Sequence, residues 1–223
     1  MHRDMALTDQ PLSDGAGSPS ADCPPDNDSS VSSRANVAEG AIIDLDGTIL
    51  DSLPYWKTLG AKYLESKGKI PEPGLQERLD SMEMDEAADY LKTVYGLSED
   101  VLTIRNELLA EIRHVYTDDA PLLPHSRELL RTLHERGVRI ALFTAAESTA
   151  AEAALSRTGI RQFFDCVIST VGTGLDKSKP EAYIYALERL GTPLQSTTVY
   201  EDAPYAVAGA RLTGMNVITP DMI

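Results

Sequence analysis

The chain has 223 residues, which suits one ordinary domain or a core with a modest insertion and excludes two large domains. With 42% hydrophobic residues but no apolar run of about 18 residues, the composition predicts a globular protein without a membrane span. The 35 acidic and 20 basic residues give a net charge of −15, which repels nucleic-acid phosphates and anionic membrane surfaces. We therefore expect neither nucleic acid nor a membrane as a partner.

Residues 1–39 are rich in serine, proline and aspartate and contain no aromatic residue, so they offer little apolar surface to offset the entropy of ordering. We predict a disordered N-terminal tail, either a solvated extension or an interaction arm, with the ordered chain beginning near Gly40. The segment also lacks the apolar stretch of a signal peptide, and Cys23 and Cys166 are too few for a framework of several disulfides. These features favour a cytoplasmic protein.

From Gly40 onward, short apolar runs alternate with helical stretches, a pattern typical of a parallel sheet with crossover helices. Helices are expected at 126–136, 148–158 and 181–190, and each precedes a glycine suited to a left-handed helix end. The fold class predicted is α/β, with a doubly wound, Rossmann-like parallel sheet. Its five strands are expected at 41–45, 138–143, 166–169, 198–200 and 216–218.

The alternation is interrupted after the first predicted strand. Residues 52–119 contain no convincing strand, but they contain four runs with helical periodicity, at 53–67, 76–82, 85–95 and 98–116. We interpret this segment as a small helical cap, inserted into a core formed by residues 40–51 and 120–223.

The first predicted strand leads into two acidic residues, Asp44 and Asp46, in the sequence Asp-Leu-Asp-Gly-Thr. Ligands of open α/β sheets bind where the strands end, so both side chains are expected near that crevice. One carboxylate can attack phosphorus to form an aspartyl-phosphate, while the other donates a proton to the leaving oxygen and then activates water. A calcium loop is excluded, because Tyr55 occupies the twelfth position where such a loop needs glutamate. A simple turn without catalytic function remains an alternative.

Three later segments carry matching chemistry at or after strand ends. Thr144 can hold a phosphoryl oxygen, or it can cap a helix together with Glu147. A lysine in the loop after the third strand, Lys177, can neutralise a nucleophile and a phosphoryl group, although a lone loop lysine is usually only solvated. Glu201 and Asp202 follow the fourth strand, where adjacent carboxylates need a cation such as Mg²⁺, whereas helix capping would explain Asp202 alone.

In this order, the four segments resemble the motifs of the haloacid dehalogenase superfamily of phosphotransferases over about residues 41–218. The helical insertion resembles that of its beta-phosphoglucomutase-like subgroup. The resemblance implies a nucleophile and metal ligand at Asp44, and at Asp46 a general acid and base whose backbone carbonyl also binds the metal. It further implies that Thr144 and Lys177 hold the phosphoryl group and that Glu201 and Asp202 complete the metal site. It favours Lys177 over the nearby Lys179, because the family lysine lies three residues before this proline and six before the tyrosine.

The chain also departs from the beta-phosphoglucomutase pattern. Trp56 stands where that enzyme has a histidine, and Met84 replaces an expected basic residue of the cap. Without a cap cation to hold a second phosphate, hydrolysis is favoured over mutase chemistry. Trp56 and Met84, with Tyr55 and Met82, are candidates for an apolar substrate-binding face, although helix packing is the simpler role for any one of them.

The resulting functional prediction is a Mg²⁺-dependent phosphatase that hydrolyses a small phosphorylated metabolite, such as a sugar phosphate, through an aspartyl-phosphate. A phosphosugar mutase and a catalytically weak binding protein are the alternatives, and a halide-releasing dehalogenase is disfavoured. We expect a monomer or weak homodimer. The family commonly continues beyond the fifth strand, whereas only residues 219–223 remain here. One face of the sheet is therefore expected to lack part of its cover.

Overall fold

The computed structural model describes residues 38–80, 82 and 84–222. The predicted disordered tail, 1–39, lies outside these residues except for its last two positions. Glu39 is already attached to the sheet, because its backbone N–H donates to the carbonyl of Ser196 at 2.8 Å. Within the described residues, no helix combines the length and apolar character needed to cross a membrane.

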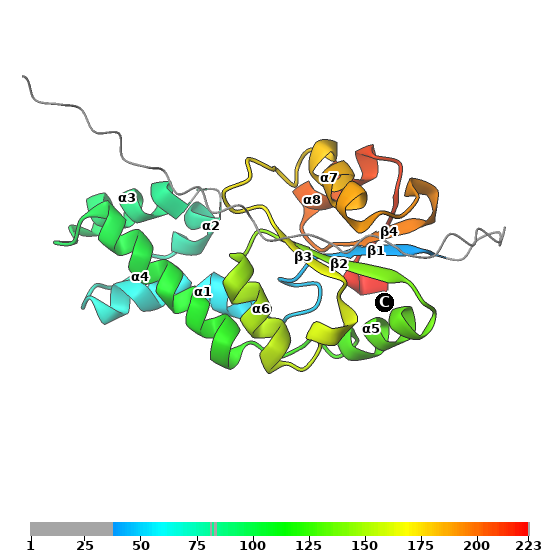
Figure 1. Ribbon diagram of the computed structural model, residues 1–223. Helices are drawn as coiled ribbons and strands as arrows, with labels where there is room; N and C mark the ends of the chain where they lie inside the picture. The colour runs from blue at the N-terminus through cyan, green and yellow to red at the C-terminus, as the bar shows by residue number, and fades with distance from the viewer. Residues whose placement is uncertain (1–37, 81, 83, 223) are drawn as a thin grey trace, which may run out of the picture.

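A parallel sheet of five strands forms the centre of the molecule, in the order β3-β2-β1-β4-β5 (Figure 1). The predicted α/β, Rossmann-like fold class is confirmed. The first strand stops two residues earlier than expected, because the chain turns after Ile43, although Leu45 is also buried. The strands are β1 (Gly40–Ile43), β2 (Arg139–Thr144), β3 (Cys166–Ser169), β4 (Thr197–Tyr200) and β5 (Asn216–Ile218).

Helices cover both faces of the sheet (Figure 1). Neighbouring residues of β1 contribute to separate cores, Ile42 to one face and Ile43 to the other, as expected for a strand buried on both sides. The prediction that one face lacks part of its cover is therefore wrong for the central strands. At the edge strand β5, Asn216 is exposed and Ile218 is half-buried. The covering helices are α5 (Ser126–Glu135), α6 (Ser148–Arg157), α7 (Pro180–Leu190) and α8 (Pro204–Leu212).

Four helices lie between β1 and α5, and we call them the helical insertion. They are α1 (Leu53–Ser66), α2 (Leu75–Leu79), α3 (Met84–Tyr95) and α4 (Val101–His114). Helix α4 begins at a favourable N-cap, because the Asp100 carboxylate accepts a hydrogen bond from the backbone N–H of Thr103 at 2.7 Å. The helical insertion lies beyond the carboxyl ends of the strands, so it faces the edge where the acidic residues were predicted (Figure 1).

The chain returns from the insertion to the core through a single π-helical turn, η1 (Val115–Asp119). This turn continues directly from α4, where the sequence predicted a helix ending at residue 116. Short 3-10 turns complete the connections at η2 (Arg161–Phe163), η3 (Leu194–Ser196) and η4 (Pro220–Met222). The predicted helix ends at Gly137, Gly159 and Gly191 are confirmed, since all three glycines have positive φ angles between 65° and 73°.

Candidate active site

The carboxyl ends of three adjacent strands bring the predicted residues together. Asp44 follows β1, Thr144 ends β2, and Glu201 with Asp202 follows β4. Asp44, Glu201 and Asp202 line the base of a cavity of about 540 Å³ that extends to the helical insertion, whereas Thr144 is buried beneath its lining. The spatial convergence follows from the strand order, because β1 pairs with both β2 and β4.

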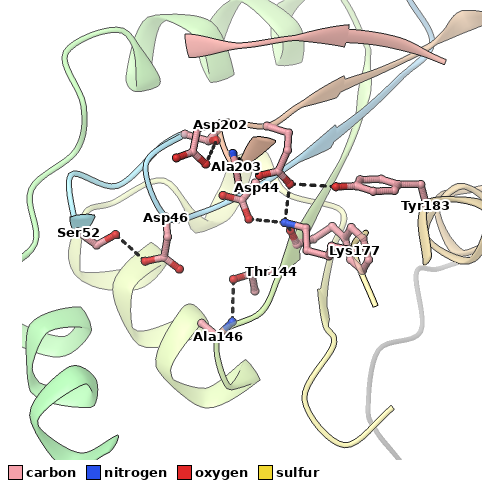
Figure 2. A network of polar contacts seen from close by, with 12 residues as sticks. Asp44, Asp46, Ser52, Thr144, Ala146, Lys177, Tyr183, Asp202 and Ala203 are labelled. Atoms are coloured by element: carbon pink, nitrogen blue, oxygen red, sulfur yellow. Dashed lines mark hydrogen bonds and ion pairs between the residues drawn. The ribbon is translucent and has the colours of Figure 1, made fainter. Parts of the chain in front are cut away.

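Lys177 reaches into this cluster from the loop before α7. Its Nζ lies 2.6 Å from Asp44 Oδ1 and 2.6 Å from Glu201 Oε2, and it also donates to the carbonyl of Phe143 at 3.2 Å (Figure 2). Burial alone would lower the pKa of Lys177, but Asp44 and Glu201 raise it above its usual value. Lys177 therefore carries its charge between two carboxylates, whereas the alternative candidate, Lys179, is exposed at the start of α7.

Glu201 is held at both carboxylate oxygens. Tyr183 donates to Oε2 at 3.0 Å, and the backbone N–H of Ala203 donates to Oε1 at 3.3 Å. Burial and the neighbouring Asp44 raise the pKa of Glu201 to about 7, while Lys177 opposes this shift. No functional role was predicted for Tyr183, which served only to place Lys177 within the motif; in the structure its hydroxyl group orients Glu201.

Three carboxylates form a candidate metal-binding cluster. Asp44, Glu201 and Asp202 each offer an oxygen, and these three oxygens lie within 4.8 Å of one another. Thr48 Oγ1 donates to Asp202 Oδ1 at 3.3 Å. A Cβ atom on Gly47 would lie 2.2 Å from Asp202 Oδ2, so only glycine fits this turn, whose φ is +76°. A purely carboxylate donor set suits a hard divalent cation that prefers oxygen ligands.

The side chain of Asp46 is directed away from this cluster, towards the insertion. Its Oδ1 accepts hydrogen bonds from Ser52 at 2.5 Å and from Tyr116 at 2.8 Å. Burial raises the pKa of Asp46 to about 6, Asp44 adds to the shift, and hydrogen bonds from Ser52, Tyr116 and Trp56 oppose it. The carboxyl group is therefore able to take up and release a proton near neutral pH.

Thr144 is fully buried beside the cluster. Its Oγ1 accepts a hydrogen bond from the backbone N–H of Ala146 at 3.0 Å (Figure 2). Helix α6 starts later, after Glu147, so Thr144 does not cap it. The threonine hydroxyl and the adjacent loop backbone lie at the same edge of the sheet as Asp44, because β1 and β2 are neighbouring parallel strands.

The helical insertion provides the opposite wall of the cavity. Trp56, Met82 and Met84 line it, whereas Tyr55 does not. Tyr55, Trp56 and Met84 all pack against the core, and Lys62 lies over the Tyr55 ring. Two arginines of α4, Arg105 and Arg113, also line the cavity.

The prediction that the insertion lacks a cation at the site is therefore wrong, because two of its arginines border the cavity. That prediction rested on the segment around Met84 alone. Arg105 and Arg113 lie further along the insertion, and their spacing of eight residues places both on one face of α4. In the structure Arg105 pairs with Asp85 at 2.6 Å, and Arg113 pairs with Glu147 of the core at 2.9 Å.

Comparisons with known proteins agree with this geometry. A family model described as haloacid dehalogenase-like hydrolase matches residues 38–214. A phosphorylated carbohydrates phosphatase of Thermotoga maritima is 24% identical over 180 residues, covering 81% of this chain and 83% of the relative. Fructose-1-phosphate phosphatase of Escherichia coli is 26% identical over 179 residues, covering 80% and 94%. A solved Thermotoga maritima structure, provisionally assigned as a beta-phosphoglucomutase, shares the fold with a TM-score of 0.71 at 24% identity, covering 80% of this chain and 83% of that chain.

Proposed function

Because the chain belongs to the haloacid dehalogenase-like hydrolases, we propose that it is a Mg²⁺-dependent phosphatase of small phosphorylated carbohydrates. The observation that carries this proposal is the difference between the surroundings of two aspartates. Asp44 is paired with Lys177 at the base of the cavity, while Asp46 lies apart in surroundings that raise its pKa to about 6. One carboxylate is thus arranged for attack and the other for proton transfer.

In the proposed first step, an Asp44 oxygen attacks phosphorus while the bond from phosphorus to the leaving oxygen breaks. Asp46 supplies the proton that the leaving alcohol requires. In the second step, Asp46 takes a proton from water as the water oxygen attacks the aspartyl-phosphate, which releases phosphate and restores Asp44. Lys177 and the Thr144 hydroxyl stabilise the negative charge of the phosphoryl oxygens.

The proposed ligands for Mg²⁺ are the side chains of Asp44, Glu201 and Asp202, together with the backbone carbonyl of Asp46. The donor chemistry supports this, because Mg²⁺ is bound through carboxylates and substrate phosphate oxygens. When bound, the ion would neutralise charge on the transferring phosphoryl group. The protein itself contributes the spacing of the carboxylates and the orientation of Glu201 by Tyr183.

We further propose that residues 52–119 act as a cap over the core formed by 40–51 and 120–223. The sugar portion of the substrate would contact Trp56 and Met84, on the wall opposite Asp44. A cavity of about 540 Å³ falls in the range of small-molecule sites. A cytoplasmic location remains a prediction.

The proposal is tested by measuring phosphate release from a panel of sugar phosphates, with and without Mg²⁺. We expect metal-dependent release by the wild-type protein and loss of release in Asp44→Asn, which keeps the size of the side chain but removes its nucleophilic carboxylate. As a matched control, Asp51→Asn alters a nearby aspartate outside the cavity lining and should retain activity. Activity unchanged in Asp44→Asn would contradict the mechanism.

A phosphosugar mutase is the second candidate, and the two cavity-lining arginines of α4 are the observation that favours it. Arg105 or Arg113 would hold the second phosphate of a bisphosphate intermediate. Formation of an isomeric sugar phosphate without net phosphate release would identify this activity. Failure to form a phosphoryl or beryllofluoride adduct at Asp44 would instead favour a catalytically weak binding protein.

A further inference from the structure

A tyrosine from the returning π-helical turn contacts the carboxyl group of Asp46. The hydroxyl of Tyr116 lies 2.8 Å from Asp46 Oδ1 and 2.9 Å from Oδ2, and the tyrosine is buried. We infer that Tyr116 is a positioning residue, which holds the Asp46 carboxyl group in the orientation needed for proton transfer. This inference rests on the proposed phosphatase function.

Two hydroxyl groups from different segments restrict the Asp46 carboxyl group. Because the Tyr116 oxygen is almost equidistant from both carboxyl oxygens, it lies in front of the group and limits its tilt. Ser52 donates to Oδ1 alone at 2.5 Å and limits rotation about the last side-chain bond. Ser52 lies at the start of the insertion and Tyr116 just after its end, so the two linking segments meet at this carboxyl group.

The backbone of Tyr116 is fixed by the core rather than by the insertion alone. Arg157, at the end of α6, donates from Nε to the Tyr116 carbonyl at 3.0 Å and from the same guanidinium to the carbonyl of Ala120. Helix α6 packs against both β3 and the π-helical turn. The backbone that carries the Tyr116 phenol is therefore held by the Arg157 guanidinium, which bridges the turn. Because Arg157 belongs to a helix that packs on the sheet, this contact fixes the turn relative to the sheet.

The tyrosine does not need to contact phosphorus to affect the reaction. A sugar phosphate releases a strongly basic alkoxide, so its departure depends on a correctly placed proton from Asp46. The p-nitrophenolate ion is a weak base and leaves without that proton. Loss of the Tyr116 hydroxyl should therefore slow the first class of substrate much more than the second.

The experiment compares Tyr116→Phe with Tyr63→Phe. The control variant loses a similar phenol-to-carboxylate hydrogen bond, from Tyr63 to Glu107 Oε2 at 2.6 Å, between two residues that do not line the cavity. For Tyr116→Phe we expect kcat/KM for a sugar phosphate to fall about 10- to 100-fold, a part of the roughly 100- to 10,000-fold that general acid catalysis contributes, and to fall less than about threefold for p-nitrophenyl phosphate. Competitive inhibition by inorganic phosphate should be unchanged, because phosphate binding does not require proton transfer. Tyr63→Phe should retain wild-type kcat/KM for both substrates.

Each outcome decides the inference. Equal losses for both substrates, or a Tyr116→Phe profile matching that of Tyr63→Phe, would overturn the positioning role while the wild-type protein still confirms phosphatase activity. A wild-type protein that releases phosphate from neither substrate would overturn the proposed function and the inference with it. Asp46→Asn should itself cause a selective loss with the sugar phosphate, because it removes the proton donor. Adding Tyr116→Phe to Asp46→Asn should then cause no further selective loss; a further selective loss would contradict an action through Asp46.

Discussion

A glycine in α8 controls how closely that helix approaches the Lys177 loop. A Cβ atom at Gly209 would lie 2.3 Å from the Lys177 carbonyl oxygen, 2.7 Å from the Ser178 carbonyl carbon and 3.0 Å from the Lys179 nitrogen. All three are backbone atoms, so Gly209→Ala requires the loop or the helix to move. We expect this movement to displace Lys177 from Asp44 and Glu201.

Gly60 in α1 provides a matched control. A Cβ atom there would also approach another atom to 2.3 Å, but that atom is the side-chain Cδ1 of Leu79, beside a second cavity of about 230 Å³. Leu79 can rotate away, whereas the backbone around Lys177 cannot. Replacing glycine by alanine within a helix adds about 1 kcal/mol to the free energy of unfolding in both variants, so this contribution cancels in the comparison.

The remaining difference is the strain of overpacking, about 1–3 kcal/mol. The free energy of unfolding of Gly209→Ala should therefore be lower than that of Gly60→Ala by this amount, a difference measurable by urea denaturation. Since a misplacement of about 1 Å near a reacting centre can reduce activity about 100-fold, kcat of Gly209→Ala should fall by about 10- to 100-fold. Equal stability of the two variants, together with an unchanged kcat in Gly209→Ala, would refute the reasoning.

Three further predictions concern charged residues. Lys177→Met leaves two buried carboxylates without their cation, so it should lower the free energy of unfolding by about 3–5 kcal/mol and abolish phosphate release. The control variant Lys179→Met should change neither quantity in the same denaturation and release assays. Asp202→Ala should raise the Mg²⁺ concentration needed for half-maximal activity, and an unchanged metal titration would contradict its ligand role. Lys67 lowers the pKa of Glu99 from 4.5 to about 2, so this ion pair stabilises the fold above about pH 4.5 and its contribution is lost as the pH falls towards 2. The melting temperature of Glu99→Gln should therefore fall less steeply with decreasing pH than that of the wild type over this acidic range. Equal slopes of melting temperature against pH would contradict a stabilising role of this ion pair.

The strands and the convergence of the main acidic residues could be predicted because both follow from local patterns and parallel topology. Asp44 and Glu201 are 157 positions apart, but each directly follows a strand, and β1 pairs with β4. The bend after Ile43 was not predicted, because apolar character continues to Leu45 and gives no sign of where the strand ends.

The residues that sequence reasoning missed lie on helices whose packing angles no local pattern specifies. Tyr116 ends a predicted helical run and reaches a carboxyl group 70 positions away only because a π-helical turn redirects the chain. Tyr183 reaches Glu201 through the packing of α7 against the sheet. The spacing of Arg105 and Arg113 indicated a shared helical face, but it did not indicate that this face borders the cavity.

The position of β1 gives the two proposed reaction partners unequal mechanical support. Asp44 directly follows a strand that is hydrogen-bonded to neighbours on both edges, so moving it would disturb two ladders at once. Asp46 lies beyond that strand and depends on Ser52 and Tyr116, which border the helical insertion. Redesigning the insertion to accept other substrates would therefore leave the nucleophile Asp44 in place while changing the position of the proton donor Asp46. Variants with a new substrate range should first succeed with substrates whose leaving groups depart without a proton.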